Sequence, residues 1–284
     1  MGSYRKILAA IDGSETSLNA LKQAFKLACT EKCWITVVSV VPPYEGDLDL
    51  TAVGNVMKTM RKPCEDALSE ARKLAESERA SIKTVCEEGE IFERIVDVSE
   101  ADNCDLIVMG RRGMRPLGRA FVGSVTARVI GYSSKDILVV HEKVAVEWKN
   151  IVIATDGSKY SNTATEKAIA FARSYGGELK VISVVDVPTE YYAEAPKAVE
   201  DLTRKAKSFV EDVKKKTETF GIKASTFIGE GETYQVITDF AKKENADVII
   251  LGSHGRTGIR RLLMGSVTEK VIGYAPCPVL IVKI

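Results

Sequence analysis

The apolar positions of this chain change their period repeatedly, and the change predicts strands and helices in turn. Short continuous apolar runs at 5–11 and 34–41 are typical of strands covered on both faces of a parallel sheet. Between them, Leu18, Leu21 and Phe25 recur at helical spacing, as expected for a helix with one buried face. The pattern therefore predicts a strand, a helix and a second strand at the start of the chain.

The same alternation continues to the end of the sequence. In the first half, the pattern predicts strands at 5–11, 34–41, 81–88, 105–109 and 137–141. The first helix between them is expected to begin at Ser14 or Ser17. The later helices are expected to cover 53–79, 90–103 and 124–132. In the second half, strands are expected at 150–155, 179–185, 222–229, 247–251 and 279–282, with helices between them. Strands that alternate with helices at this spacing imply right-handed crossovers and a doubly wound parallel sheet of the α/β class.

The second half of the chain repeats the first. The segment GRRGMRPLGRAFVGSVT at 110–126 returns as GSHGRTGIRRLLMGSVT at 252–268. Upstream, ILAAIDGS at 7–14 returns as IVIATDGS at 151–158. A unit of about half the chain has therefore been duplicated.

The duplication divides the 284 residues into two expected domains, 1–143 and 144–284, each of a common domain size. Apolar residues make up 45% and charged residues 28%, as in ordinary globular proteins. The net charge of +1 argues against a general nucleic-acid binder. With no apolar run of membrane-span length and no signal-peptide core, we expect a cytoplasmic protein without a membrane partner.

The cysteines contain no C-x-x-C pair and lie mostly at positions that do not match between the halves. We therefore predict that they are small apolar core residues. A redox or metal pair of Cys29 and Cys33 is an alternative, but neither has a histidine nearby. The six cysteines are Cys29, Cys33, Cys64, Cys86, Cys104 and Cys277.

The repeated glycine segment carries the candidate chemistry. Both copies read G-x-x-G, nine residues, then G-S, and each follows a predicted strand and precedes a predicted helix. In a parallel sheet, ligands bind beyond the carboxyl ends of the strands, where the strand order reverses. Glycines bring main-chain amides close to an anion, and the helix start that follows favours a phosphate. Turn chemistry alone is the alternative, but the doubled context favours phosphate binding.

Asp12 and Asp156 are the second pair of candidate binding residues. Each stands at the end of the first predicted strand of its half and begins the sequence D-G-S. One carboxylate in that place can accept both hydroxyls of a ribose. The alternative to ribose binding is a structural role as an N-cap or in an Asx turn, and the sequence D-G-S suits such a role well. Neither reading excludes the other.

With these motifs, the chain resembles the universal stress protein family in its tandem form and its nucleotide-binding branch, over nearly all of its length. The resemblance implies two Rossmann-like domains of the adenine nucleotide alpha hydrolase type, each with a five-stranded sheet. It implies that strands 137–140 and 279–282 pair within the chain, so that the domains pack as an intrachain pseudo-dimer. It also implies ATP or AMP as the ligand, with or without Mg²⁺, and a regulatory or protective role in stress.

The resemblance extends to individual site residues. By this similarity, Asp12 and Asp156 hold ribose, the backbone around Val40 and Val184 meets adenine, and the glycine segments hold phosphates. The first predicted nucleotide site comprises Ala10, Asp12, Val40, Gly110, Arg111, Arg112, Gly113, Gly123, Ser124, Val125 and Thr126. The second comprises Ala154, Asp156, Val184, Gly252, Ser253, His254, Gly255, Arg256, Gly265, Ser266, Val267 and Thr268.

The first copy departs from the family pattern, because Arg111 and Arg112 stand where the second copy has Ser253 and His254. These arginines could bind more phosphate charge or another anion, or they could form a solvated basic face. Equal binding at the two sites is therefore left open. His254 is expected to position or hydrogen-bond a ligand rather than to act as a base.

The sequence contains no Walker A segment and no recognisable set of metal-holding carboxylates with a catalytic base or lysine. We therefore predict a nucleotide-responsive protein without catalytic residues or a metal site. A slow metal-dependent ATP hydrolase or phosphotransfer enzyme, using Asp12 or Asp156, is the first alternative. A protein-binding scaffold with vestigial sites is the second. The protein partner is unknown, and further pairing into a homodimer is left open.

Overall fold

The computed structural model describes residues 4–43, 53–113, 122–141, 144–255 and 264–284. Most of the chain up to Lys143 forms one compact unit, and the chain from Val144 onward forms a second. Among the described residues, no helix combines the length and the apolar character that crossing a bilayer requires.

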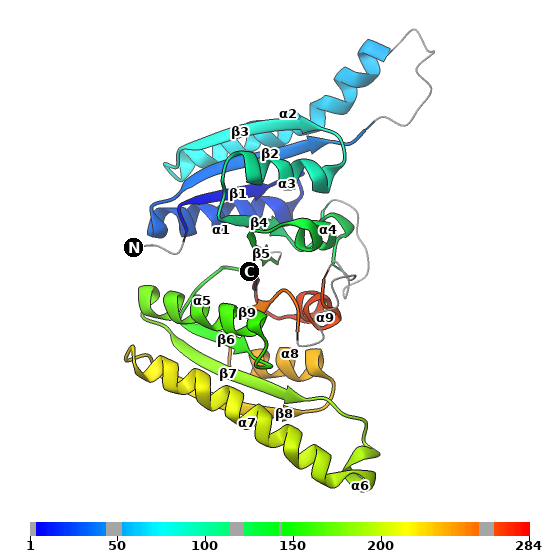
Figure 1. The fold of residues 1–284 in the computed structure, drawn as a ribbon. Coiled ribbons are helices and arrows are strands. Elements are labelled where there is room, and N and C mark those ends of the chain that lie inside the picture. The colour runs from blue at the N-terminus through cyan, green and yellow to red at the C-terminus, as the bar shows by residue number, and fades with distance from the viewer. Residues whose placement is uncertain (1–3, 44–52, 114–121, 142–143, 256–263) are drawn as a thin grey trace. The chain divides into compact units, whose positions relative to one another are not determined.

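The first unit is a parallel sheet with helices between its strands (Figure 1). Its strands run in the order β3-β2-β1-β4-β5, and every neighbouring pair is parallel. Its strands are β1 (Lys6–Ala10), β2 (Trp34–Val41), β3 (Ile82–Glu88), β4 (Leu106–Gly110) and β5 (Asp136–Val140). Its helices are α1 (Glu15–Glu31), α2 (Val53–Ser77), α3 (Ile91–Ala101) and α4 (Ser124–Tyr132).

The second unit repeats this order, with strands arranged β10-β9-β6-β7-β8 and all neighbours parallel. Its strands are β6 (Asn150–Ala154), β7 (Glu178–Val185), β8 (Ala224–Glu230), β9 (Val248–Gly252) and β10 (Val279–Val282). Its helices are α5 (Lys159–Tyr175), α6 (Tyr191–Glu194), α7 (Pro196–Glu218), α8 (Thr233–Lys243) and α9 (Ser266–Tyr274). The predicted doubly wound parallel α/β class is therefore confirmed. Pairing of the final strands of the two halves stays a prediction.

Local sequence explains where the helices begin and end. The side chain of Ser14 accepts a hydrogen bond from the Ser17 amide, so Ser14, the first of the two predicted starts, caps α1. Ser158 caps α5 in the same way. Gly176 ends α5 in the left-handed conformation, with φ of 63°, which glycine adopts without strain. The repeated sequence thus builds the same strand-to-helix turn in both units.

The predicted elements agree closely with the observed ones. Strand 34–41 and helix 124–132 have the predicted limits, whereas the strand expected at 222–229 runs from Ala224 to Glu230. The short helix α6 was not predicted, because its four residues are all exposed and leave no buried periodic face in the sequence. Central strands β1 and β4 are almost fully buried, which accounts for their continuous apolar runs.

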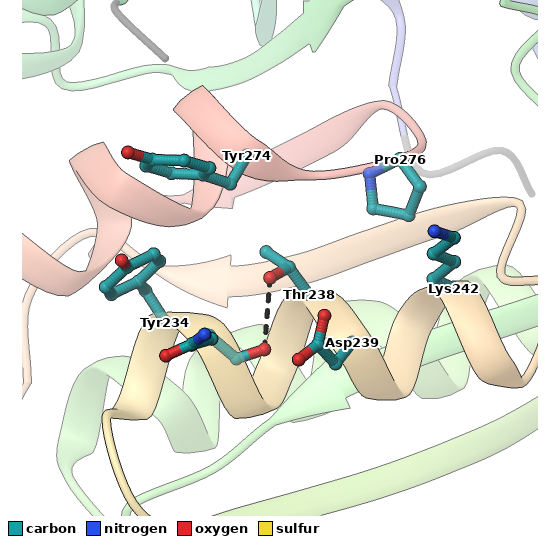
Figure 2. A pocket seen from close by; sticks show the side chains of 7 residues that line it. Tyr234, Thr238, Asp239, Lys242, Tyr274 and Pro276 are labelled. Carbon is teal, nitrogen blue, oxygen red and sulfur yellow. Dashed lines mark hydrogen bonds between the residues drawn. The ribbon is translucent and has the colours of Figure 1, made fainter.

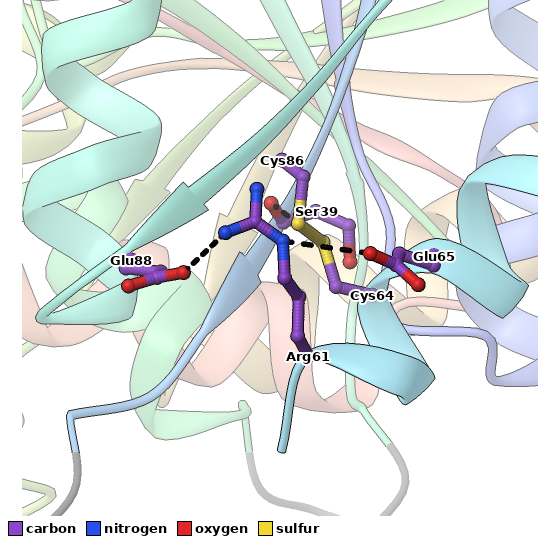
Figure 3. A network of polar contacts seen from close by, with 6 residues as sticks. All are labelled: Ser39, Arg61, Cys64, Glu65, Cys86 and Glu88. Carbon is purple, nitrogen blue, oxygen red and sulfur yellow. Dashed lines mark hydrogen bonds and ion pairs between the residues drawn. A yellow bond between two sulfur atoms is a disulfide. The ribbon is translucent and has the colours of Figure 1, made fainter. Parts of the chain in front are cut away.

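The prediction that the six cysteines are core residues was wrong for Cys29, Cys33 and Cys86, and it missed the bond that Cys64 makes. Cys64 on α2 and Cys86 on β3 form a disulfide with a Cα–Cα distance of 6.3 Å (Figure 3). Cys29 is exposed and Cys33 is half-buried. Cys104 and Cys277 are the expected buried thiols, and burial raises the pKa of the Cys277 thiol to about 12. Sequence spacing missed the bond because its two residues meet through the packing of a helix on a strand.

Carboxylates fix the amino ends of the central strands in both units. In the first, Asp105 Oδ2 accepts hydrogen bonds from the amides of Arg5 at 2.7 Å and Lys6 at 3.0 Å. In the second, Asp247 Oδ2 accepts hydrogen bonds from the amides of Asn150, the first residue of β6, and of Lys149 just before it. These acids satisfy strand-end amides, so a structural role accounts for them.

Asp102 gives the first unit a predictable sensitivity to acid. Hydrogen bonds from Lys83 Nζ at 2.7 and 2.9 Å, and one from Thr36 Oγ1, lower the pKa of the Asp102 carboxyl. Its stabilising contribution is therefore complete above the unfolded-state pKa of about 3.9 and is lost as pH falls through the lower folded pKa. We expect Asp102→Asn to reduce the fall in unfolding free energy between pH 6 and pH 2.5, measured by urea titration. The control Asp97→Asn, on an exposed helix surface, should leave that fall nearly unchanged.

Candidate functional site

The predicted site residues gather where the strand order of each unit reverses. In the first unit, β2 and β3 lie on one side of β1 and β4 and β5 lie on the other. Because parallel strands end at the same edge of the sheet, the ends of β1, β2 and β4 place Asp12, Val40 and Gly110 at that edge. In the second unit the same edge holds Asp156, Val184 and Gly252. Ala10 and Ala154 are the last residues of β1 and β6.

Asp12 makes contact with the glycine segment through its carboxylate. Oδ1 accepts hydrogen bonds from the Ser14 amide at 3.1 Å and from Ser14 Oγ at 2.6 Å, which is the Asx turn considered for this sequence. Oδ2 faces Gly113 so closely that a Cβ there would lie 2.3 Å from it. The Asx turn and the contact with the loop therefore use different oxygens of one carboxylate.

The second unit has the same arrangement, with a slightly larger distance between the aspartate and the second glycine. Asp156 Oδ1 accepts a hydrogen bond from the Ser158 amide at 3.0 Å. A Cβ on Gly255 would lie 3.0 Å from Asp156 Oδ2. Residues far apart in the sequence thus meet twice in the same way, with little space for a side chain at the second glycine of each G-x-x-G.

Main-chain hydrogen bonds shape the loop after β4. The Arg111 amide donates to the Val140 carbonyl at 2.9 Å, and the Gly123 amide donates to the Arg111 carbonyl at 2.9 Å. Thr126 Oγ1 donates to the Gly110 carbonyl at 3.0 Å from a buried position. Corresponding bonds in the second copy join Ser253 to Val282, Gly265 to Ser253 and Thr268 to Gly252. The Gly123 amide and the Thr126 hydroxyl are therefore engaged within the loop, and their predicted contact with phosphate stays untested.

The start of α4 presents the groups that suit an anion. Gly123 occupies the N-cap of α4 and Gly265 the N-cap of α9. As glycines, they have no side chain to cap the first-turn amides. Ser124 is exposed and Val125 is half-buried at the beginning of α4. First-turn amides have no partner within their own helix, and the helix dipole favours negative charge beside them. Ser266 and Val267 take the corresponding exposed places on α9.

Aromatic contacts and an ion pair join α4 to α3. Phe92 and Tyr132 pack with ring centroids 5.0 Å apart, and Arg128 lies over the Phe92 ring while its Nη1 is 3.6 Å from Glu90. The second unit has the corresponding cluster of Tyr234, Tyr274, Lys270 and Glu232. Both copies hold the last turn of the candidate anion-binding helix at a fixed place on its neighbour.

The two copies differ in the side chains between their first two glycines. Arg111 and Arg112 are half-buried, whereas Ser253 is buried and its Oγ lies 3.2 Å from Nδ1 of His254. Tyr160, which the sequence did not indicate, packs against the His254 ring at 5.2 Å between centroids. The sequence signal that could have indicated Tyr160 is its position in the first turn of the helix that follows D-G-S. Arg256 lies outside the described residues.

The described residues contain no group of three or more His, Cys, Asp or Glu side chains suited to a metal ion. A binding role for Mg²⁺ beside a bound nucleotide therefore stays a prediction.

A pocket of about 270 Å³ lies elsewhere in the second unit, between α8 and the end of α9 (Figure 2). Two tyrosine rings line one side of it, and Thr238 donates a hydrogen bond to the Gln235 carbonyl within its wall. Its lining residues are Tyr234, Gln235, Thr238, Asp239, Lys242, Tyr274 and Pro276. None of these is a predicted site residue, so we do not assign the nucleotide to this pocket.

Comparisons with known proteins agree with this architecture. The model of the universal stress protein family matches residues 3–141 and again 147–283. A universal stress protein of Methanocaldococcus jannaschii is 42% identical over 142 residues, which cover 48% of this chain and 82% of that protein. One from Mycolicibacterium smegmatis is 25% identical over 98% of this chain and 96% of its own length. A solved universal stress protein structure from Archaeoglobus fulgidus has a TM-score of 0.77 at 23% identity, covers 99% of this chain and 97% of its own, and supports the fold alone.

Proposed function

The chain belongs to the universal stress protein family, with two family domains in tandem, and from that premise we propose that it binds adenine nucleotide at both strand-order reversals. The bound nucleotide, ATP or AMP, acts as a regulatory or protective ligand in stress and not as a substrate. Binding to the folded state alone stabilises that state by mass action, so the nucleotide concentration is read out as a change in stability or surface.

One observation carries the proposal: in each unit, an aspartate after the first strand faces the second glycine of the loop after the fourth strand. Asp12 does so with Gly113 and Asp156 with Gly255. A carboxylate beside a glycine loop places an acceptor for ribose hydroxyls next to main-chain donors for phosphate. The juxtaposition occurs twice, which supports one ligand class for both sites.

The other predicted residues take their roles from their position on the sheet edge. In the first unit, the end of β2 at Val40 supplies backbone groups for adenine beside Asp12. The first turn of α4, with exposed Ser124 and half-buried Val125, supplies amides for the phosphates. Arg111 and Arg112 add charge to the first site, so we expect its affinity to depend more strongly on the number of phosphates than that of the second site.

The direct test is to identify what the protein carries. Freshly purified full-length protein is denatured, and the released small molecules are separated by ion-exchange chromatography beside ATP, ADP and AMP standards. We expect ATP or AMP, with up to two nucleotides per chain after saturation. Protein that releases no nucleotide and binds neither ATP nor AMP in calorimetry would contradict the proposal and favour the scaffold alternative.

The proposal includes no catalytic step, and this can be measured separately. We expect incubation with ATP and Mg²⁺ to give no sustained release of phosphate by the wild-type chain. Sustained turnover that requires Mg²⁺ and is lost in Asp156→Ala would replace the proposal with the hydrolase alternative. Asp247→Asn, at the opposite end of the strands, is the matched control for loss of an aspartate from the same unit.

A further inference from the structure

Two cysteines from distant parts of the sequence meet at the outer edge of the first unit's sheet. Cys64 lies on α2 and Cys86 lies on β3, the edge strand next to β2, and the two are separated by 22 residues in the sequence. Figure 3 shows the disulfide beside the paired strands β2 and β3, with Arg61 bridging Glu65 and Glu88 next to it. The bond therefore ties a covering helix directly to the edge strand.

The two cysteine residues differ in their exposure to solvent. Cys64 is only 3% exposed, whereas Cys86 lies on the edge strand and is half-buried. A small oxidant in solution therefore reaches Cys86 more easily, and Cys64 is placed to complete a bond with it. This division of roles, an accessible cysteine next to a resolving cysteine, is typical of redox-responsive pairs.

The second unit shows that the fold does not require this bond. Cys86 pairs in register with Ser39, and the same register in the second unit pairs Ile228 with Ser183. An isoleucine therefore occupies the place of Cys86.

The helix position is matched as well. Ala67 on α2 and Phe209 on α7 each face the glycine that follows the first-strand aspartate. Three residues earlier on these helices stand Cys64 and the buried Ala206. Two family domains of one chain thus differ by a complete cysteine pair, which indicates a property confined to the first unit.

The same packing also accommodates the reduced pair. The Cys64 sulfur is 3.5 Å from the Ser39 carbonyl oxygen, so a thiol there can donate its hydrogen to that oxygen. Leu68 and Ala71 on the same helix are also buried, so α2 has apolar contacts besides the disulfide. Just before Cys64, Pro63 has no amide hydrogen for the helix ladder, so α2 is locally weaker where the bond holds it.

We propose that Cys64 and Cys86 form a reversible redox-active pair that fastens α2 to β3 when a hydroperoxide oxidises it. The Cys86 thiolate attacks hydrogen peroxide, the O–O bond breaks, and hydroxide leaves to become water. The Cys64 thiolate then attacks the Cys86 sulfenic acid, forming the S–S bond and releasing a second hydroxide, which also takes a proton. Two thiols lose two electrons and two protons in total, and one peroxide becomes two waters. A dithiol returns the pair to two thiols by exchange and is itself oxidised to a disulfide.

The location connects this chemistry to the proposed nucleotide site. Ser39, which Cys64 contacts, immediately precedes Val40 at the carboxyl end of β2. An effect of oxidation on nucleotide affinity rests on the proposed function, whereas the redox reaction itself does not. In the cytoplasmic location that we expect, thiols are normally kept reduced, so the bond would form during oxidative stress.

The test compares reduced and peroxide-treated full-length protein without nucleotide. Free thiols are alkylated, the protein is digested without reduction, and the peptides are examined by mass spectrometry. We expect a peptide cross-link between Cys64 and Cys86 after peroxide, its loss after dithiothreitol, and a melting midpoint of the first unit higher by roughly 5–10 °C in the oxidised protein.

Matched variants keep the proposal falsifiable. Cys86→Ser should abolish both the cross-link and the shift, and Cys29→Ser should retain both. If buried Cys64→Ser does not fold, Cys86→Ser alone decides the result, because its position is half-buried. Absence of the cross-link after peroxide, its persistence in folded protein under dithiothreitol, or an unchanged midpoint would overturn the proposal. Loss of nucleotide binding in every sample would contradict the proposed function without affecting this result.

Discussion

Gly113→Ala should weaken nucleotide binding at the first site and leave the affinity of the second site unchanged. A Cβ at this position would lie 2.3 Å from Asp12 Oδ2, and two hydrogen bonds from Ser14 hold the other oxygen of that carboxylate. The carboxylate must therefore leave the place in which it would accept ribose hydroxyls. We expect the affinity of that site to fall at least about tenfold, which corresponds to about 1.4 kcal/mol. Isothermal titration with ATP and with AMP measures both quantities.

The second unit provides the matched comparison for this substitution. Gly255→Ala places its Cβ 3.0 Å from Asp156 Oδ2, so a smaller shift relieves the contact and the loss should be smaller. Neither glycine has a positive φ, so both variants should keep the wild-type melting midpoint without nucleotide. Unchanged affinity and a stoichiometry of two in Gly113→Ala would show that the contact between aspartate and glycine does not form the site.

Gly157→Ala should destabilise the second unit far more than Gly13→Ala destabilises the first. Both glycines have left-handed φ values, 74° and 81°, so alanine costs about 1 kcal/mol at either position. At Gly157, the new Cβ would also lie 2.3 Å from the Phe209 ring, whereas at Gly13 its nearest neighbour is the Ala67 Cβ at 3.8 Å. We expect losses of about 3 kcal/mol and about 1 kcal/mol, measured by urea unfolding.

A double variant separates the two causes. Phe209→Ala gives the second unit the side chain that the first unit has at this position, so it should remove the clash in Gly157→Ala. The double variant should therefore be less destabilised than the sum of the two single variants, which a double-mutant cycle quantifies. Equal losses for Gly13→Ala and Gly157→Ala, or additive losses in the cycle, would exclude the ring contact as the cause.

Much of the fold could be predicted because its signals are local. Buried strands such as β1 and β4 are continuous apolar runs, and Ser14 and Ser158 mark helix starts by their side-chain chemistry. The duplication then placed the candidate site twice without any structural information. The short exposed helix α6 has no buried face, and for that reason its sequence gave no periodic signal.

The remaining features depend on contacts between distant segments, which no local pattern encodes. Spacing placed Asp12 and Gly113 at one edge of the sheet, but only the packed loop showed that a carboxylate oxygen fills the space beside the glycine. The partners of Cys64 and His254 were equally inaccessible, because each lies on a different element of the unit.

The sequence by itself determined the family, the alternation of strands and helices, the duplication and the edge of each sheet at which a ligand is expected. Periodicity and motif spacing are properties of neighbouring residues, so they can be read along the chain. Only the tertiary structure decided which side chains touch, because strand register and helix rotation set those distances. The disulfide in the first unit and the aromatic contact of Gly157 in the second are its clearest results, since both distinguish units that the repeated motifs made look alike.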